Sequence, residues 1–488
     1  MTDGSQSACP PEIRVPDCAR GSQTGTRIVT GGPVAPPLVI TGCAIATVDA
    51  AGTEHRDGHL VLRDGRIERV GPGPAPAIDG ATVVEARGCL ATPGLVNTHH
   101  HLYQWATRGL APDGTLFQWL TTSYPVWAGL DEDVVGAAAE AGLAWLAMTG
   151  CTTTTDHHYV FPAGSGDLLG AEIAAARRVG LRFHPTRGSM DLGASRGGLP
   201  PDSVVEDIDT ILAASAAAID EHHDPSPDSM LRMGIAPCSP FSVTADLLTA
   251  AADLARDKGV RLHTHLAETL DEQDFCAEKF GCRPAEYLER LDWLGPDVWF
   301  AHSVHLSDSD IALLAGSGSG VAHCPSSNAR LGAGIARTRA LRDAGVPVGL
   351  GVDGAASNES CSLVEELRHA LLMARATGGP TAMTVREALA LATIGGAKVL
   401  GRADDIGSLE VGKQADVALW RLDGPGHAGI DDPVAALVLG SAPPLDLLTV
   451  RGRTVVRAGQ VVTVDSGQTT AAGVRATSTL LRRAGLSG

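Results

Sequence analysis

Lysine is scarce in this sequence: the 488 residues include only four, and the formal net charge is −18. Proteins that dock on nucleic acid neutralise phosphates with clustered Lys and Arg side chains. The charge therefore argues against nucleic acid as a partner. We expect a free small molecule as the substrate.

Long apolar runs are absent as well. A membrane-spanning helix needs a run of about 18 or more apolar residues, and none occurs, so we expect no membrane partner. Residues 1–37 are rich in Gly, Pro, Ser and Thr and lack the basic and apolar regions of a signal peptide. We interpret them as a disordered extension and expect a cytoplasmic protein.

The ten cysteines include no CxxC pair, and several lie within apolar runs. Because no secretory signal precedes them, reduced and buried thiols are expected rather than a disulfide framework.

Short apolar runs broken by Gly and Asp-Gly turns occupy both ends of the chain. They read LVITGCAIATV, GHLVLRDGRIERVG and TVVEARGCLATPG after residue 38, and IGSLEVGKQADVALWRL and LLTVRGRTVVRAGQVVTV near the other end. Such runs predict strands joined by tight turns. We expect residues 38–93 and 402–475 to form one small composite β-sandwich domain, followed by a C-terminal tail at 476–488.

Between residues 94 and 401, short apolar runs alternate with longer amphipathic stretches, as in repeated βα units. In one unit, Asp131 opens a predicted helix, Gly150 closes it, and the strand CTTTTD follows. The predicted fold class is therefore α/β, a (β/α)8 TIM-like catalytic barrel that carries the composite β-domain. In such barrels, catalysis takes place at the carboxyl ends of the strands.

Histidines stand two residues apart in the segment GLVNTHHHLYQ. On a strand, His99 and His101 project from the same face and can bind one ion, whereas His100 points the other way. Taken alone, this pair fits a polar strand end at least as well as a metal site.

Three further strand-like runs end on polar side chains. HTHLAE supplies His265 and, three residues on, Glu268, which a loop could place above a metal as an acid or base. VWFAHSVHL contains His302, and VPVGLGVDG contains Asp353, whose carboxylate is costly to bury unless it is paired or bound to metal. Each has an ordinary alternative, namely a helix cap, a surface group or a Gly-rich turn.

Together the four motifs favour a metal site, because each closes a predicted barrel strand, in the order HxH, His, His, Asp. Three His nitrogens and one carboxylate oxygen suit one divalent ion, with Zn²⁺ favoured and Fe²⁺ the alternative. Such an ion lowers the pKa of a bound water toward about 7 and so provides hydroxide at neutral pH. The sequence thus predicts metal-dependent hydrolysis.

The segments PGLVNTHHH, HTHLAE, AHSVHL, HCPSSN and GVDGAASN resemble the amidohydrolase superfamily, in its branch of cytosine deaminases, guanine deaminases and chlorohydrolases. The resemblance covers residues 38 to 465. It implies that Glu268 shuttles a proton to a ring nitrogen, that His302 holds the attacking water and that Asp353 takes the proton of this water. It also implies four metal ligands: His99, His101, His265 and Asp353.

Members of that superfamily with two metals usually carry a bridging carboxylated Lys at the end of a middle barrel strand. The four lysines of this chain lie elsewhere, at Lys258, Lys279, Lys398 and Lys413. We therefore expect one metal ion.

Longer stretches, including RFHPTRGSMDLGASRGGLPPDSVVED and KFGCRPAEYLERLDWLGPDVWFAH, resemble the 8-oxoguanine deaminase group, which is also labelled hydroxydechloroatrazine ethylaminohydrolase. That group converts 8-oxoguanine into urate and ammonia. Because loops select the substrate, s-triazines, isocytosine, pterins and guanylurea-type compounds stay alternatives. A non-catalytic binding protein on the same barrel is a remote alternative, since the implied ligands and acid/base groups are all present.

Four residues are candidates for substrate contacts. Gln104 matches an amide of guanine-type deaminases, whose donor and acceptor can read a lactam edge. His157 and Arg187 end neighbouring strand-like runs and could contact ring oxygens or, equally, fix loops through backbone hydrogen bonds. Trp119 lies in APDGTLFQWLTTSYPVW, which has the composition of a lid, although these aromatics could instead pack between the barrel and the sheet domain.

A few other residues complete the expected site. His323 is expected to support it from behind the ligands, and His305 to lie in a loop. Ser303 and the N-terminal extension match the group's pattern least well, and a Ser303 that lined the pocket would favour another ring. The resemblance also implies that the chain could form a homo-oligomer.

Overall fold

Eight parallel strands close into a barrel, as the βα pattern predicts. The computed structural model describes residues 36–486, so the expected extension at 1–37 lies almost entirely outside the described residues. Neighbouring strands along the chain pair with each other, and β13 pairs with β6 to close the ring. The strands are β6 (Leu95–Asn97), β7 (Cys151–His158), β8 (Arg182–Ser189), β9 (Gly234–Pro237), β10 (Arg261–Leu266), β11 (Val298–His302), β12 (Gly320–His323) and β13 (Val348–Leu350).

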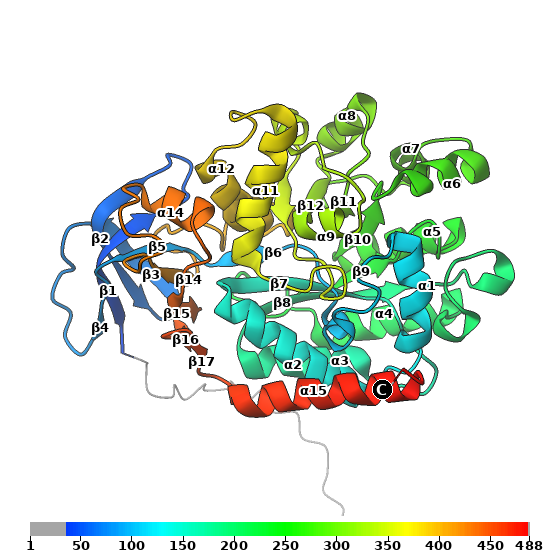
Figure 1. Cartoon of the computed structure of the whole chain (residues 1–488), viewed down its shortest axis with the longest axis horizontal. Coiled ribbons are helices and arrows are strands. Elements are labelled where there is room, and N and C mark those ends of the chain that lie inside the picture. The colour runs from blue at the N-terminus through cyan, green and yellow to red at the C-terminus, as the bar shows by residue number, and fades with distance from the viewer. Residues whose placement is uncertain (1–35, 487–488) are drawn as a thin grey trace, which may run out of the picture. The chain divides into compact units, whose positions relative to one another are not determined.

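Helices surround the barrel (Figure 1). The largest apolar core contains strand residues such as Leu262 and Phe300 together with helix residues such as Leu143 and Leu367, all buried. Burying the apolar stripe of each helix against the strands holds such a layered fold together. The helices are η1 (Leu102–Thr107), α1 (Leu116–Trp127), α2 (Glu132–Met148), α3 (Leu168–Val179), η2 (Ala194–Arg196), η3 (Asp202–Val204), α4 (Ile208–His222), α5 (Ala245–Lys258), α6 (Leu270–Phe280), α7 (Pro284–Arg290), α8 (Asp308–Ser317), α9 (Pro325–Arg330), α10 (Thr338–Asp343), α11 (Leu363–Gly378), α12 (Val385–Ala390), η4 (Leu391–Gly395), α13 (Gly396–Val399), α14 (Pro433–Leu439) and α15 (Ser466–Arg483).

The unit built on α2 shows how the local sequence dictates the fold. The Asp131 side chain accepts a hydrogen bond from Val134 N and so caps the start of the helix. Gly150 adopts φ +91°, and a Cβ there would lie 2.2 Å from the Trp420 ring, so this turn requires glycine. Strand β7 begins at the next residue. The predicted helix start and strand are confirmed.

The two terminal segments pair with each other in a nine-stranded sheet, at the left of Figure 1. Strand β5 lies antiparallel to β14, with Leu90 opposite Trp420. Asp64 and Gly65, which join β2 to β3, both have positive φ, as tight hairpin turns of the Asp-Gly type require. The predicted β-sandwich is thus a single hydrogen-bonded sheet. Its strands are β1 (Leu38–Ala46), β2 (Glu54–Arg63), β3 (Arg66–Pro72), β4 (Thr82–Glu85), β5 (Cys89–Pro93), β14 (Val417–Arg421), β15 (Leu445–Val450), β16 (Arg453–Arg457) and β17 (Gln460–Val461).

The C-terminal end differs from the prediction. Helix α15 packs along α2 and η1, below the barrel in Figure 1. The expected boundary between the β-domain and a tail, at residues 475 and 476, falls inside this helix. The sequence pattern hides α15 because only one of its buried side chains, Leu480, is large and apolar. We retain the other two expected domain boundaries, 93/94 and 401/402, as a proposal.

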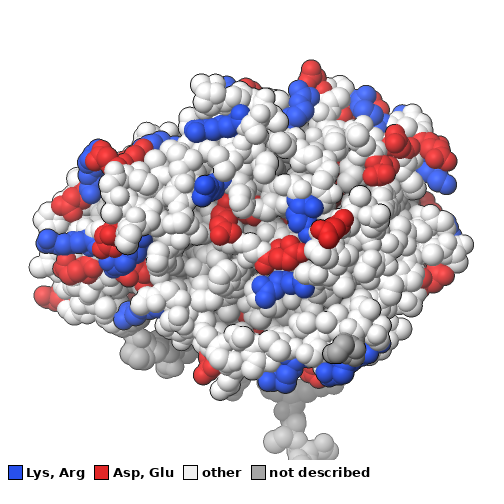
Figure 2. Space-filling model, in the orientation of Figure 1, with Lys and Arg blue, Asp and Glu red and all other residues white. Residues whose placement is uncertain are grey.

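The described residues contain no membrane-spanning helix and no disulfide. Within residues 36–486, no helix is both long and apolar enough to cross a bilayer. The eight cysteines of that range are free and buried, as expected for reduced thiols, and Cys9 and Cys18 lie outside it. On the face shown in Figure 2, acidic and basic side chains are interspersed rather than gathered by sign.

A buried ion pair joins the barrel to the sheet domain. Arg182 opens β8, and its guanidinium is bonded to the carboxylate of Asp416, the residue before β14. Both side chains are almost fully buried. Asp416 Oδ1 also accepts a hydrogen bond from Arg451 N at 2.8 Å. The pair therefore connects segments that are far apart in the sequence.

We expect Asp416→Ala to lower the free energy of unfolding by about 3–5 kcal/mol, because Arg182 would keep a buried charge without its partner. Denaturant unfolding followed by circular dichroism measures the change. Asp343→Ala, which removes the exposed partner of Arg339, is the control and should leave the midpoint nearly unchanged. Equal shifts of the midpoint in the two variants would contradict the importance of the buried pair.

Candidate active site

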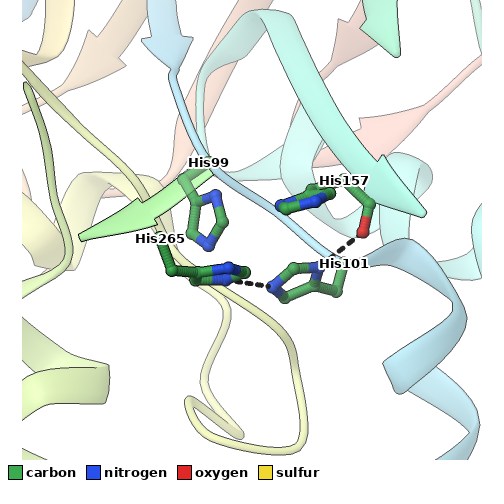
Figure 3. A group of neighbouring side chains, drawn as sticks. All are labelled: His99, His101, His157 and His265. Atoms are coloured by element: carbon green, nitrogen blue, oxygen red, sulfur yellow. Dashed lines mark hydrogen bonds between the residues drawn. The ribbon is translucent and has the colours of Figure 1, made fainter. Parts of the chain in front are cut away.

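The four expected metal ligands converge at the carboxyl ends of the barrel strands. His99 Nε2 lies 3.2 Å and His101 Nε2 lies 3.3 Å from Asp353 Oδ1. His265 Nε2 lies 3.3 Å from His101 Nε2 (Figure 3). Tetrahedral ligands that are each about 2.0–2.1 Å from Zn²⁺ lie about 3.3–3.4 Å from one another. The spacing therefore fits one small cation.

Hydrogen bonds behind the rings determine which nitrogen faces the centre. His101 Nδ1 lies 2.6 Å from His157 O, and His265 Nδ1 lies 2.8 Å from Cys238 O. Carbonyl oxygens only accept hydrogen bonds, so both Nδ1 atoms carry the hydrogen, and both Nε2 atoms present a lone pair.

His99 is oriented by a relay through His263. His263 Nδ1 donates to Trp299 O at 2.9 Å, which leaves His263 Nε2 to accept from His99 Nδ1 at 2.8 Å. His99 Nε2 is thus a third buried lone pair, and it has no hydrogen-bond partner within residues 36–486. Lone pairs that face one point repel each other unless a cation lies between them, so these donors fit a divalent metal. Sequence reasoning missed His263, although it stands two residues before His265 on the same face of β10.

The electrostatics of these groups match metal ligation. Burial is the main effect that lowers the pKa of His99, His101 and His265, so all three stay neutral. Burial opposes the charged form of Asp353, but the neighbouring histidines outweigh it and hold the pKa of that carboxyl well below its usual range. Neutral imidazoles and an ionised carboxylate are the states that bind a metal.

Two serines hold the Asp353 carboxylate from the side away from the centre. Its Oδ2 accepts hydrogen bonds from Ser327 Oγ at 2.6 Å and Ser357 Oγ at 3.0 Å. Oδ1 is left to face the histidines. Ser327 belongs to HCPSSN, and no pattern in the sequence predicts that a serine of this motif lies at the site.

Glu268 and His302 face each other beside this centre, with Glu268 Oε2 3.7 Å from His302 Nε2. His302 Nδ1 pairs with Asn328 Oδ1 at 2.9 Å, which directs Nε2 into the site. Burial raises the pKa of Glu268 and favours its protonated form. Burial would lower the pKa of His302, but the carboxylates of Glu268 and Asp353 outweigh it, and the pKa is raised. The pair of Glu268 and His302 can therefore hold a proton for transfer.

Tight turns place these side chains directly after their strands. Ala267, His302 and Asp353 adopt φ of +50°, +66° and +60°, in the left-handed region. The turn after β10 is held by the Glu272 carboxylate, which accepts from Ala267 N at 2.8 Å and Glu268 N at 3.1 Å. Sequence reasoning missed Glu272, because a glutamate in a helical stretch carries no distinct signal.

A cavity adjoins the site. Aromatic and aliphatic side chains such as Trp119, Phe241 and Leu331 make up much of the wall, and His101, Glu268 and other residues of the site are part of it. The lining, within residues 36–486, contains no Lys or Arg. The cavity thus suits a molecule without anionic substituents.

Gln104 reaches this cavity from η1, directly after β6. Both of its amide atoms are buried and have no hydrogen-bond partner in the part of the chain described. A Cβ at Gly354 would lie 1.8 Å from Gln104 Oε1, so only glycine leaves room for the amide. The amide offers one edge of donors and an acceptor to a ligand, and the expected position of Gln104 at the substrate is consistent with this geometry.

Helix α1 lines the cavity with Trp119, whose Nε1 donates to Ala356 O at 3.0 Å. In Figure 1, α1 lies on the opposite side of the barrel from the sheet. The alternative that these aromatics pack between barrel and sheet domain is therefore wrong, and the lid interpretation of this segment agrees with its position.

His157 and Arg187 do not line the cavity. The His157 ring stacks on that of His265 with centroids 4.9 Å apart, and its Nε2 donates to Ala236 O at 2.8 Å. Its Nδ1 is therefore a buried lone pair without a partner among residues 36–486, and it lies within 4.8 Å of ligand atoms of His99, His101 and His265 (Figure 3). Arg187 bonds to Glu206 Oε1 at 2.8 Å and lies over the Phe161 ring. Successive strand residues alternate between faces, and Arg187 projects outward from β8. These contacts agree with the alternative that Arg187 fixes a loop.

Three further residues lie outside the cavity lining. Ser303 is buried and does not touch the cavity, so it gives no reason to expect another ring. His305 Nε2 donates to Ala333 O at 2.7 Å in a loop, as expected. His323, at the end of β12, is buried, and burial lowers its pKa to about 3.

Known proteins are similar to this chain in both sequence and fold. The sequence profile of the amidohydrolase family matches residues 90–477. An 8-oxoguanine deaminase from Pseudomonas aeruginosa is 46% identical over 411 residues, which cover 84% of this chain and 91% of that protein. An isoxanthopterin deaminase from an unknown prokaryotic organism is 39% identical over 77% of this chain and 83% of its own length.

A solved structure agrees with these relatives. The atrazine chlorohydrolase from Arthrobacter aurescens, in complex with zinc, superposes with a TM-score of 0.86 at 34% identity, covering 90% of this chain and all of that one. Family profile, relatives and fold point the same way: the chain belongs to the amidohydrolase family and is a hydrolase that acts on C–N bonds.

Proposed function

We propose that this enzyme deaminates 8-oxoguanine to urate and ammonia. The observation that carries the proposal is the Gln104 amide, which has no partner among residues 36–486, in a mostly apolar cavity beside histidines and an aspartate that could hold a metal ion. A lactam ring offers the matching donor and acceptor. The 46% identity to an 8-oxoguanine deaminase supports this ring among the N-heterocycles.

We assign one divalent ion, zinc in the first instance, to His99, His101, His265 and Asp353. When bound, such an ion supplies a hydroxide nucleophile near neutral pH. The zinc complex of the related chlorohydrolase supports this choice, and Fe²⁺ is the alternative.

The side chains around the centre have separate tasks in the proposed reaction. Protonated Glu268 donates its proton to a ring nitrogen, which prepares the neighbouring carbon for attack by water. The Asp353 carboxylate accepts the proton of this water and passes it to the departing amine. His302 holds the water oxygen, and Gln104 orients the lactam edge.

A pterin is the second candidate substrate. Isoxanthopterin carries the same aminopyrimidinone edge as 8-oxoguanine, and its deaminase is 39% identical to this chain. The Gln104 amide would read both molecules alike, so the walls of the cavity must discriminate between them. s-Triazines, isocytosine and guanylurea-type compounds remain further alternatives.

We expect Glu268→Gln to keep the metal but to lower kcat by about 10²–10⁴-fold, because the amide cannot deliver a proton to the ring. Steady-state kinetics and elemental analysis of the same preparation test both parts. Glu278→Gln, on the exposed side of α6, should behave like the wild type. Undiminished turnover in Glu268→Gln would remove the proton shuttle from the mechanism.

Elemental analysis should return about one divalent ion per chain. We expect exhaustive chelation to abolish turnover and added Zn²⁺ to restore it. His263→Leu should weaken metal affinity by about 10–100-fold, because His99 loses the partner that fixes its tautomer. His305→Gln is the matched control and should retain the metal. Two ions per chain, or activity that survives chelation, would contradict the single-metal site.

Ammonia release from 8-oxoguanine, guanine, isocytosine, isoxanthopterin and a hydroxytriazine tests the substrate. We expect kcat/KM for 8-oxoguanine to exceed that for the other compounds by at least about tenfold, because small differences in pocket fit produce ratios of this size. A higher kcat/KM for the pterin or the triazine would replace 8-oxoguanine in the proposal.

A further inference from the structure

A second buried polar cluster lies beside η1, the helix that carries Gln104, and has no role in the reaction above. Asp156 and His158 end β7, and Glu172 belongs to α3, and all three side chains are fully buried. Their ligand atoms lie within 4.8 Å of one another, a composition and spacing that metal sites share. The hydrogen bonds of the cluster indicate a different role.

The contacts of this cluster show where its protons must lie. His158 Nε2 donates to Val160 O at 2.9 Å, because a carbonyl oxygen only accepts. His158 Nδ1 lies 2.8 Å from Glu172 Oε1, a contact that requires one proton between the two atoms. Asp156 and Glu172 offer carboxyl oxygens within 4.8 Å of each other, and Asp156 Oδ2 and Glu172 Oε2 are buried without a hydrogen-bond partner among residues 36–486. Two buried carboxyl groups this close favour a second proton between them, because like charges repel.

Two protons held in this way would make the cluster neutral. Two carboxylates beside a neutral imidazole carry a charge of −2, and two protons cancel it. Burial raises the pKa of Glu172 to about 8, which agrees with a proton retained there. A neutral cluster attracts a cation less than the ionised carboxylate and the unprotonated nitrogens around His99 do.

The cluster acts instead on the backbone that carries Gln104. Asp156 Oδ1 accepts a hydrogen bond from Leu102 N at 2.6 Å, and Leu102 opens η1, two residues before Gln104. The next residue of β7, His157, accepts from His101 Nδ1 through its carbonyl. Because the Gln104 amide has no partner of its own among the described residues, its place in the cavity depends on where this backbone is held.

We propose that Asp156 and Glu172 are positioning residues, a proton-sharing carboxyl pair that holds the first turn of η1 and thereby presents the Gln104 amide to the substrate. Glu172 acts through Asp156, which it aligns, and His158 anchors Glu172. The effect on turnover rests on the proposed function, whereas the effect on the backbone does not.

A comparison of Asp156→Ala with Asp156→Asn tests whether Asp156 positions the backbone of η1 or only fills space. Alanine removes the acceptor for Leu102 N, so KM for 8-oxoguanine should rise by at least about tenfold, with about one metal ion per chain retained and kcat changed less than KM. Asparagine keeps that acceptor and replaces the shared proton by an amide hydrogen toward Glu172. It should stay within about threefold of the wild-type KM.

A double-mutant cycle shows whether Asp156 acts through Gln104. Gln104→Ala should raise KM by itself, and adding Asp156→Ala should then change KM little, because the amide that it positions is gone. Equal fold-changes in the two backgrounds would overturn the proposal. So would two metal ions per chain in the wild type of which Glu172→Gln loses one.

Hydrogen–deuterium exchange of the peptide covering residues 100–107 provides a readout that needs no substrate. We expect faster exchange in Asp156→Ala and wild-type exchange in Asp156→Asn. If Asp156→Ala does not fold, a comparison of Glu172→Leu with Glu172→Gln gives the same test. Leucine removes the polar contacts of Glu172 with His158 and Asp156, whereas glutamine can keep them. Unchanged exchange would overturn the positioning role. Altered exchange in an enzyme inactive on 8-oxoguanine would overturn only the proposed substrate.

Discussion

The structure depends on three imidazole lone pairs and one carboxylate oxygen that face a single point in the barrel. His101 and His265 are held in this state by backbone carbonyls, and His99 by its relay through His263. Burial keeps the rings neutral, so protons do not relieve the repulsion between them. The barrel therefore holds lone pairs whose mutual repulsion a bound cation would relieve. The strands around these side chains must be rigid enough to keep them in place.

Two buried polar clusters lie next to β7, and they differ in how their charge is compensated. Around His99, hydrogen bonds use every outward nitrogen and leave the inward ones without protons. Around Glu172, burial raises the pKa of this carboxyl to about 8, and the proposed shared protons would leave Asp156, Glu172 and His158 without net charge. Residue types alone would not separate the two, since both combine His with carboxylates. The direction of each hydrogen bond indicates which cluster suits a metal ion and which suits a backbone amide.

The sequence predicts the barrel, the pairing of the terminal segments and the convergence of the four ligand candidates, because apolar periodicity and polar strand ends are local patterns. Other features depend on distant partners. Arg187 projects outward only because of its place in the strand, and the role of Glu272 depends on the backbone of a turn four residues earlier. Helix α15 escapes prediction because it buries small side chains against α2.

The pairing of β5 with β14 has a consequence for how the chain acquires its shape. The hydrogen bond from Trp420 Nε1 to Thr92 Oγ1 spans 328 positions, and the link between Arg182 and Asp416 spans 234. A ribosome must therefore release nearly the whole polypeptide before the first strands meet their final neighbours. Until then β1 to β5 present an incomplete sheet edge, so nascent chains should depend on chaperones more than those of barrels whose ends fold locally.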